Sequence, residues 1–224
     1  MNGLLGFYKE TCSGLWETID EERDIQAKYR FDIKSNTLYI FFQGSVSATD
    51  WKINLEFFPP SPSFRIAGKR IWGHRGFVHS MRRVWGWTAG TIKKHYPAQV
   101  VFSGYSQGAA YAEITTVISA YKYGSLTFNG GPACYAFGGP PVWWFRKRTM
   151  RAAGICYRDI IRVEHRGDPV VLLPHLVLMR AIGKQLKIGK LLDYLPRFWE
   201  THFPRTYEKA LEEQEINHIK ENLG

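Results

Sequence analysis

One stretch near the middle of the chain constrains the fold more than any other part of the sequence. A run of β-branched and aromatic residues at 100–102 leads into Gly104-Tyr105-Ser106-Gln107-Gly108, and small residues and then a helical pattern follow. In this setting the pattern G-x-S-x-G is typical of a tight turn that presents a nucleophilic serine between a strand and a helix. Glycine two residues before and after the serine removes the Cβ atoms that would collide in such a turn. Ser106 is therefore the candidate nucleophile.

The motif alone is weak evidence, because the chain contains 21 glycines and short matches arise by chance. The alternative is an ordinary Gly-Ser turn without a catalytic role. If the turn is a nucleophile elbow, the following helix points its backbone amides and positive dipole end at Ser106, which favours developing negative charge. The N–H of Gln107 is then the expected donor of an oxyanion hole.

Length and composition set the broad class of the protein. The 224 residues and 45% hydrophobic content suit one domain with a sizeable core. We find no signal-peptide pattern and no apolar run that could span a bilayer, which predicts a cytoplasmic protein. Cys12, Cys134 and Cys156 lack metal-ligand spacing, so buried thiols are expected rather than disulfides or a zinc site. The net charge of +10 is compatible with nucleic acid, an anionic membrane or plain solubility.

Hydrophobic periodicity predicts an alternation of strands and helices. Alternating residues at 27–33, a polar turn and a buried run at 38–42 predict a β-hairpin. Further strands are predicted at 99–103, 133–137 and 159–165. Helices are predicted at 4–22, 77–92, 109–121, 143–151 and 208–222. Prolines at 59–63 exclude regular structure there, and the apolar and basic residues 176–196 are interpreted as an insertion bordering the mouth of the site.

The exit of the second hairpin strand carries a resemblance to a known family. Gly44-Ser45-Val46-Ser47-Ala48-Thr49-Asp50-Trp51-Lys52-Ile53-Asn54-Leu55 is similar to a motif of the class 3 lipases, the fungal-type triacylglycerol lipases and their bacterial and plant relatives. The family motif reads roughly R-G-[ST]-x-S-x-x-[DN]-W-x-x-[ND]-L. The resemblance places Ser45 in the oxyanion hole, where a fixed hydroxyl can donate to a developing oxyanion. Gln43 stands where the family usually has Arg, so the contacts of that Arg are not expected here.

Other stretches resemble the same family in the same order. His74-Arg75-Gly76-Phe77 is similar to its H-x-G-F, residues 137–142 to its F-G-x-P-x-V, and Asp168-Pro169-Val170 to its D-P-V. The resemblance makes Asp168 the acid of a triad in the chain order Ser, Asp, His of α/β-hydrolases. An Asp-Pro turn is the alternative for Asp168. His74 precedes the nucleophile and is expected to be structural, because the base of this fold follows it.

Two histidines are candidates for the base. His202 precedes the last predicted helix, as in the family's D-H-x-x-Y, whereas His175 lies only seven residues beyond Asp168. We favour His202, because this fold presents its base on a loop before the last helix. Thr201 replaces the acid common in the family, and Tyr207 is spaced differently from the family's Tyr, which suggests a shifted helix start.

Large apolar residues follow Ser45, in the stretch where the family places its lid. Trp51, Leu55 and Phe58 fall at helical spacing, although alternation also fits this stretch. We expect a mobile cover that hides apolar surface in water and opens at a lipid boundary. The alternative is that Trp51 and Leu55 are fixed core residues and that the site is permanently open.

The resemblance covers about residues 27–211 and implies a single α/β-hydrolase domain over residues 1–224, with a mostly parallel sheet and helices on both faces. It implies hydrolysis of carboxylic esters, acylglycerols or other lipid esters, through an acyl-enzyme and without a metal or cofactor. The expected partners are the lipid or ester substrate and, transiently, an anionic lipid surface; no nucleic acid is expected. A cutinase-like enzyme or a small-ester esterase is the alternative within this chemistry. An inactive basic module that binds nucleic acid or membranes is the alternative from another class.

Overall fold

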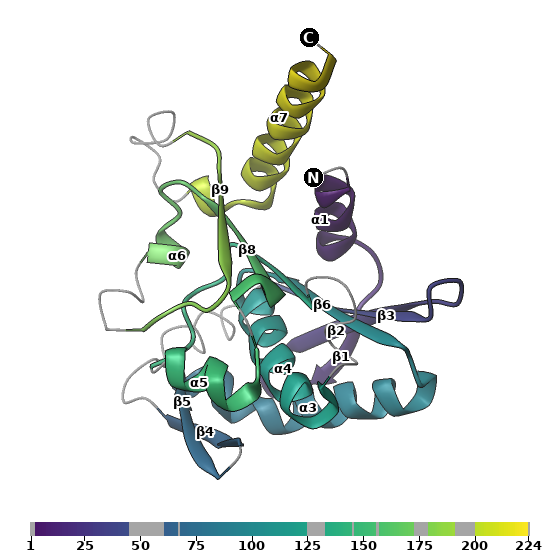
Figure 1. Ribbon diagram of the computed structural model, residues 1–224, viewed down its shortest axis with the longest axis vertical. Coiled ribbons are helices and arrows are strands. Elements are labelled where there is room, and N and C mark those ends of the chain that lie inside the picture. The colour runs from purple at the N-terminus through teal and green to yellow at the C-terminus, as the bar shows by residue number, and fades with distance from the viewer. Residues whose placement is uncertain are drawn as a thin grey trace.

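A seven-stranded sheet forms the centre of the protein (Figure 1). The computed structural model describes residues 3–44, 61–66, 68–124, 133–144, 146–155, 157–172, 179–190 and 200–223. The strand order is β1 (Glu17–Asp20), β2 (Ile25–Asp32), β3 (Thr37–Phe42), β6 (Gln99–Tyr105), β7 (Cys134–Phe137), β8 (Ile160–His165) and β9 (Lys184–Ile188). β1 to β3 pair antiparallel, and β3, β6, β7, β8 and β9 run parallel. The predicted hairpin and the mostly parallel sheet are confirmed.

Helices cover both faces of this sheet, as predicted (Figure 1). Two long helices and a short one pack on one face, and the first and last helices pack together on the other. The first group is α3 (Arg75–His95), α4 (Gln107–Tyr123) and α5 (Arg146–Ala153), and the second is α1 (Leu4–Cys12) and α7 (Pro204–Leu223). A short two-stranded sheet of β4 (Ser61–Ile66) and β5 (Lys69–Gly73), the short helix α6 (Pro169–Leu172) and the 3-10 turn η2 (Tyr157–Asp159) complete the described elements.

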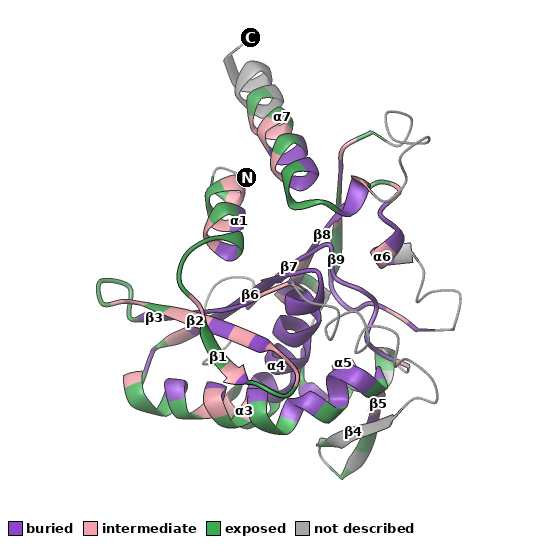
Figure 2. Cartoon of the chain, turned by 180° about the vertical axis from the view of Figure 1, so that it is seen from behind, coloured by how far each residue is buried: buried purple, intermediate pink, exposed green. Residues whose placement is uncertain are grey.

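Alternate residues of β6 contribute to two separate cores, because successive side chains of a strand point to opposite faces. Val100 and Phe102 belong to the larger core with α3 and α4. Tyr105 belongs to the smaller core with Tyr8 of α1 and Tyr207 of α7. In Figure 2 the buried residues are concentrated in the central strands and in α4. The strand that leads to Ser106 is therefore fixed from both sides.

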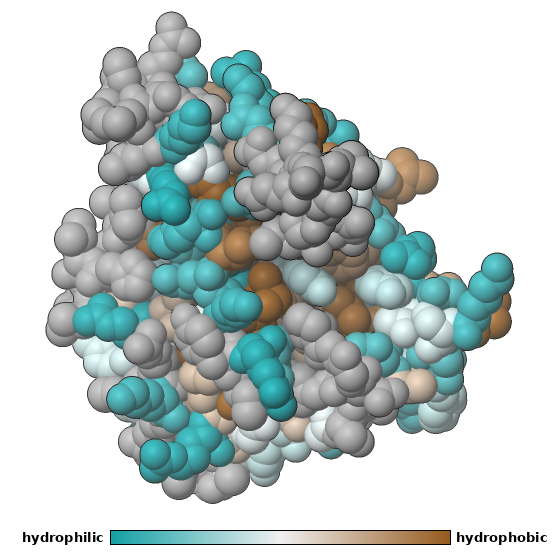
Figure 3. All heavy atoms as spheres, turned by 45° about the horizontal axis from the view of Figure 1, so that its top comes forward, coloured by the Kyte–Doolittle hydropathy of each residue, from teal (hydrophilic) through white to brown (hydrophobic). Residues whose placement is uncertain are grey.

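Contacts between the two terminal helices hold the second face together. The Tyr8 hydroxyl donates to the Pro204 carbonyl at 2.9 Å, and Lys9 forms ion pairs with Glu208 and Glu212 at 3.0 and 3.2 Å. With this end of the molecule brought forward, hydrophobic atoms are visible in the middle of the surface and hydrophilic ones around them (Figure 3). Through the contacts of Tyr8 and Lys9, α1 anchors the start of α7.

Some predicted elements are wrong at the edges of the fold. The first helix ends at Cys12 rather than near residue 22, because Gly14 has a φ of +95° and stops it, and β1 follows. Pro62 of β4 pairs with Trp72 of β5, although we predicted that the prolines at 59–63 would exclude regular structure there. A two-stranded sheet has only edge strands, and its register shifts between Pro62 and Phe64, so a proline is tolerated there.

Two other predictions were wrong, one for the edge strand β9 and one for Cys12. β9 lies within the segment that we interpreted as an insertion, and it pairs parallel with β8. Only Ile188 of this strand is buried, so the strand has little apolar signal. Cys134 is buried as predicted, whereas Cys12 is exposed.

A buried ion-pair network joins α4 to the carboxyl ends of the strands. Arg162 of β8 is 1% exposed and donates to Glu113 of α4 at 2.5 Å and to Glu164 at 2.9 Å. It also donates to the carbonyl of Gly139 at 2.5 Å, and Trp143 Nε1 donates to the other oxygen of Glu113 at 2.5 Å. The guanidinium thus fixes the turn that follows β7.

Burial and ion pairing act against each other in this network: burial dominates at Glu113 and raises its pKa, whereas the ion pairs dominate at Glu164 and Arg162. Burial opposes ionisation of Glu164, but Arg162 and Lys187 outweigh it and hold the pKa of Glu164 below its usual value. Burial likewise opposes the charge of Arg162, yet Glu113 and Glu164 outweigh it and raise the Arg162 pKa. Buried ion pairs add little net stability, but losing one partner leaves an uncompensated charge.

The close packing of α4 against β3 gives a first prediction. A Cβ at residue 108 would lie 2.1 Å from the Phe42 carbonyl oxygen, which is backbone and cannot move aside easily. We expect Gly108→Ala to lower the free energy of unfolding by about 3 kcal/mol or more, measured by urea denaturation. The matched control is Gly86→Ala in α3, where nothing lies within 4 Å and a gain of up to about 1 kcal/mol is expected. Equal effects of the two substitutions would contradict this packing.

The buried network gives a second prediction. Arg162→Met leaves Glu113 without its cation, so the free energy of unfolding should fall by about 3–5 kcal/mol. The control Arg158→Met removes an exposed arginine of η2 and should change the free energy of unfolding by no more than about 0.5 kcal/mol. Unchanged urea midpoints for both variants would show that the network does not support the fold.

Candidate active site

Ser106 occupies a strained turn between β6 and α4. Its φ is 55° and its ψ is −122°, a region that costs a residue with a side chain on the order of 1–3 kcal/mol. A Cβ on Gly104 would lie 2.1 Å from the carbonyl carbon of Gly108, so neither glycine can be replaced without moving backbone. The tight strand-to-helix turn predicted from the sequence is confirmed.

His202 lies between Ser106 and Asp168. Its Nε2 is 2.8 Å from the Ser106 Oγ, and its Nδ1 is 2.8 and 3.0 Å from the two carboxylate oxygens of Asp168. Asp168 is fully buried, and Ser106 and His202 are 6% and 9% exposed. The three side chains come from the end of β6, the end of β8 and the turn before α7. In this arrangement a carboxylate can orient an imidazole, and the imidazole can accept the proton of the hydroxyl.

The carboxylate of Asp168 has two further hydrogen-bond donors. The Tyr207 hydroxyl donates to Oδ2 at 2.5 Å, and the Val170 N–H donates to Oδ1 at 2.8 Å. Tyr207 in turn accepts the His165 N–H at 3.0 Å. Burial, reinforced by the Asp168 charge, raises the pKa of Tyr207 well above its usual value, so its hydroxyl stays protonated and donates. A Cβ on Gly138 would lie 2.9 Å from this hydroxyl, which explains a glycine there.

The segment that carries His202 is held from two sides. The Tyr105 hydroxyl donates to the His202 carbonyl, and the two rings stack with centroids 5.4 Å apart. Burial raises the pKa of Tyr105 far above its usual range, so this donor also stays protonated. Thr201 donates to the Gly167 carbonyl at 3.2 Å, which ties the segment to the turn before Asp168.

No role was predicted from the sequence for Tyr105 and Tyr207, the two tyrosines that support the geometry of the triad. Tyr207 stood out only as a residue at the wrong spacing, and α7 begins at Pro204, four residues before the predicted helix start. Tyr105 lies inside the G-x-S-x-G motif at an unspecified position. The available signal was an aromatic residue with a hydroxyl near a candidate site residue: Tyr105 directly precedes Ser106, and Tyr207 follows His202 by five residues.

Two other predicted residues are described. Gln107 is the first residue of α4 and is buried, and its N–H is among the first amides of the helix, directly after Ser106. His74 is buried, its ring stacks on Phe77 with centroids 4.2 Å apart, and its N–H donates to the Val142 carbonyl at 2.9 Å. These contacts agree with the structural role that we expected for His74. The remaining predicted residues lie outside the described part of the chain: Ser45, Trp51, Leu55, Phe58 and His175.

Two features are absent from the described residues, a cluster of metal ligands and a helix that could span a membrane. Within them, no group of three or more His, Cys, Asp and Glu side chains could hold a metal ion. None of the helices in these parts of the chain is long and apolar enough to cross a membrane.

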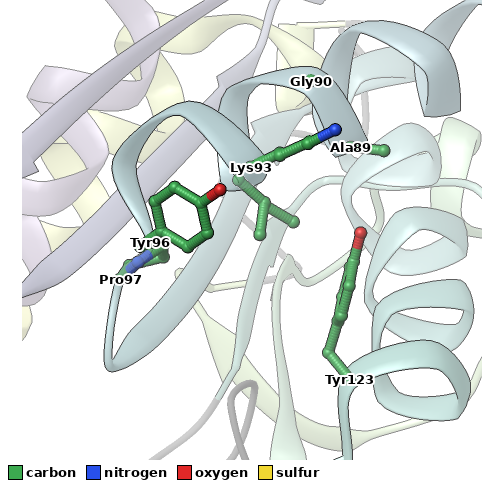
Figure 4. A pocket seen from close by; sticks show the side chains of 7 residues that line it. Ala89, Gly90, Lys93, Tyr96, Pro97 and Tyr123 are labelled. Carbon is green, nitrogen blue, oxygen red and sulfur yellow. The ribbon is translucent and has the colours of Figure 1, made fainter.

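A hollow of about 440 Å³ lies between the C-terminal ends of α3 and α4 (Figure 4). Its lining is mainly apolar and is formed by Ala89, Gly90, Ile92, Lys93, Tyr96, Pro97 and Tyr123. The 17 residues of α4 span about 25 Å. Since Ser106 and Tyr123 stand at opposite ends of α4, this hollow is separate from the candidate active site.

Several solved structures that share the fold of this chain are lipases. The native Rhizomucor miehei lipase propeptide complex has 23% identity and a TM-score of 0.63, over 78% of this chain and 56% of that one. Lipase II from Rhizopus niveus has 20% identity and a TM-score of 0.60, over 79% and 65%. A mono- and diacylglycerol lipase from Aspergillus oryzae has 21% identity and a TM-score of 0.58, over 79% and 63%. This chain thus spans little more than half of the Rhizomucor miehei chain.

A comparison with curated protein sequences gave no match. The family model for lipase (class 3) matches residues 39–178, which is more than half of the chain. This match includes the elbow, Asp168 and the parallel strands between them. The chain therefore belongs to the class 3 lipase family and has its α/β-hydrolase fold.

Proposed function

We propose that this protein is a serine hydrolase that cleaves carboxylic esters of lipids, with acylglycerols as the expected substrates. The observation that carries the proposal is the position of His202, whose two ring nitrogens lie 2.8 Å from Ser106 and 2.8 Å from Asp168. Membership of the class 3 lipase family supports a lipid ester as the substrate. The mono- and diacylglycerol lipase of Aspergillus oryzae, which shares the fold, supports an acylglycerol.

In the proposed reaction, Ser106 Oγ attacks the ester carbonyl while His202 Nε2 accepts its proton. The tetrahedral intermediate then collapses, the C–O bond to the alcohol breaks, and His202 returns the proton to the leaving oxygen. Water repeats these steps on the acyl-enzyme and releases the fatty acid. Asp168 keeps the imidazole in the required tautomer and stabilises the imidazolium. Tyr207 is a positioning residue, because it reaches the substrate only through Asp168.

The oxyanion donors in this proposal are the Gln107 N–H and Ser45. The positive end of α4 lies at Ser106, which favours negative charge beside it. A Cβ on Gly44 would lie 3.5 Å from the Ser106 Cβ. Gly44 is thus close to Ser106, and the family motif assigns the oxyanion role to the residue that follows it in the sequence, which supports Ser45 as the second donor.

The triad is tested by single and double substitutions. Ser106→Ala and His202→Ala should each lower kcat on an emulsified acylglycerol by about a thousandfold or more, because the nucleophile is lost or left unactivated. Asp168→Asn should lower kcat by a similar factor, since the amide favours the wrong tautomer. The double variant Ser106→Ala, His202→Ala should be no worse than either single one, because the residues act as a unit. Fatty-acid release at constant pH measures all four.

The matched control is His175→Ala, the histidine that the sequence left as the alternative base. It should change kcat by less than about tenfold, a loss far below that of His202→Ala. If His175→Ala abolished activity while His202→Ala kept it, the assignment of the base would be wrong. Thermal unfolding of each variant separates lost catalysis from lost structure.

A further inference from the structure

The charges of this protein are divided unequally along the chain. Residues 57–158 contain 14 of the 30 lysines and arginines but only one of the 20 aspartates and glutamates. That one acid, Glu113, is fully buried and paired with Arg162. The segment therefore has no acidic side chain available to neutralise its surface. A strong charge asymmetry of this kind points to an anionic partner.

The segment maps onto one face and one edge of the fold. It includes the β4–β5 hairpin, α3, α4 and α5, whereas α1 and α7 with their acidic residues lie on the opposite face (Figure 1). The hairpin and α5 lie side by side in both ribbon views and are in contact (Figures 1 and 2). The charge difference between the parts of the sequence is thus also a difference between the faces of the molecule.

We define the basic rim as five exposed side chains of the hairpin, the start of α3 and α5: Arg65, Arg70, Arg75, Lys147 and Arg151. In the described parts of the chain, none of the five forms an ion pair with a carboxylate. Arg83 of the same segment is different, because it pairs with Asp20 and Glu22 of the first strands. The positive charge of the rim is therefore not compensated by a carboxylate of the described residues.

The β4–β5 hairpin, which carries Arg65 and Arg70 of the basic rim, is linked through the backbone to the candidate active site. Gly73, at the end of β5, forms a bridge with Trp143, and the His74 N–H donates to the Val142 carbonyl at 2.9 Å. Five residues before Trp143 is Gly138, where a Cβ would lie 3.3 Å from an oxygen of Asp168. The hairpin is thus attached to the turn that borders the triad, at the carboxyl ends of the parallel strands.

Two tryptophans lie at the same place. Trp72 and Trp144 are half-buried. The backbone N–H of Trp144 donates to the backbone carbonyl of Trp72 at 3.1 Å, which joins the hairpin to the chain before α5. Tryptophan is favoured where one side is apolar and the other wet, as at a membrane–water interface. Basic residues around such a pair complement anionic headgroups.

We propose that the basic rim docks this protein on a lipid surface with anionic headgroups and so holds the active site at the source of its substrate. This inference rests on the proposed function for the use of docking, although binding itself does not require catalysis. Nucleic acid is the other polyanion that a basic surface could bind. Lipid is favoured because the hairpin that carries Arg65 and Arg70 is linked to a proposed site for lipid esters, and because the half-buried Trp72 and Trp144 lie where this hairpin meets the chain before α5.

The experiment measures binding of the full chain to vesicles of non-hydrolysable ether lipids. Vesicles of ether phosphatidylcholine alone are compared with vesicles that also contain ether phosphatidylglycerol, at low and high salt. The test variant is Arg70→Gln, Arg75→Gln, Lys147→Gln, Arg151→Gln. Each basic residue near an anionic surface contributes about fivefold to partitioning. If two to four of them touch the surface, the partition coefficient should fall between about 25-fold and about 600-fold.

The matched control variant is Lys34→Gln, Lys93→Gln, Lys122→Gln, Lys209→Gln. These exposed lysines give the same change in net charge but lie away from the rim, at the amino ends of the parallel strands or on α7. The control should lose less than about threefold in partitioning, because charges far from the surface are screened. Both variants should hydrolyse a soluble short-chain ester at the rate of the parent, which shows that they are folded.

Three outcomes would overturn the inference. One is equal loss of binding in the test and control variants, which would make net charge rather than the rim responsible. Another is parental binding that is the same with and without phosphatidylglycerol. The third is salt-sensitive binding of duplex DNA through the rim without binding to anionic vesicles. Vesicle binding by a chain that hydrolyses no ester would instead contradict the proposed function and leave the docking surface in place.

Discussion

The close approach of three backbone segments around Ser106 is the constraint on which the rest of the structure depends. At Gly104 and Gly108 the strand β6, the helix α4 and the end of β3 leave no room for a single Cβ atom. This contact fixes the strained conformation of Ser106 and places the start of α4 directly behind it. It also brings Gly44 beside Ser106, so the candidate nucleophile, the start of α4 with Gln107 and the end of the described chain after β3 are positioned by the same packing. Strain of this kind persists only where the surroundings determine it fully.

The two faces of the sheet contribute to different parts of the site. On one face, α4 and the buried Arg162 network hold the elbow and the turn at Gly139. On the other, α1 and α7 hold the segment of His202 through the Tyr8 and Tyr207 hydroxyls. His202 therefore meets Ser106 only when both faces are assembled. This arrangement makes the spacing of the triad a property of the whole domain rather than of any one motif.

Local sequence signals predicted the parts of the fold whose structure is determined locally. The elbow, the hairpin at β2–β3 and the helices α3 and α4 followed from glycine spacing and hydrophobic period, because these elements bury their apolar side chains; α4 is buried on all sides as far as Ala120. β9 was missed because only Ile188 is buried, and the first helix was extended past Gly14. The Arg162 contact with Glu113 and the Tyr207 contact with Asp168 join residues 49 and 39 positions apart, and no local pattern encodes such contacts.

The central claim is that Ser106 is a nucleophile activated by His202. Labelling of the full chain with a fluorophosphonate probe, followed by mass spectrometry of its peptides, tests this most directly, because the probe reacts with activated serines and needs no knowledge of the substrate. The account predicts a single labelled serine, Ser106, with much slower labelling in His202→Ala and none in Ser106→Ala. Labelling of another serine, or equal labelling of the parent and Ser106→Ala, would contradict it.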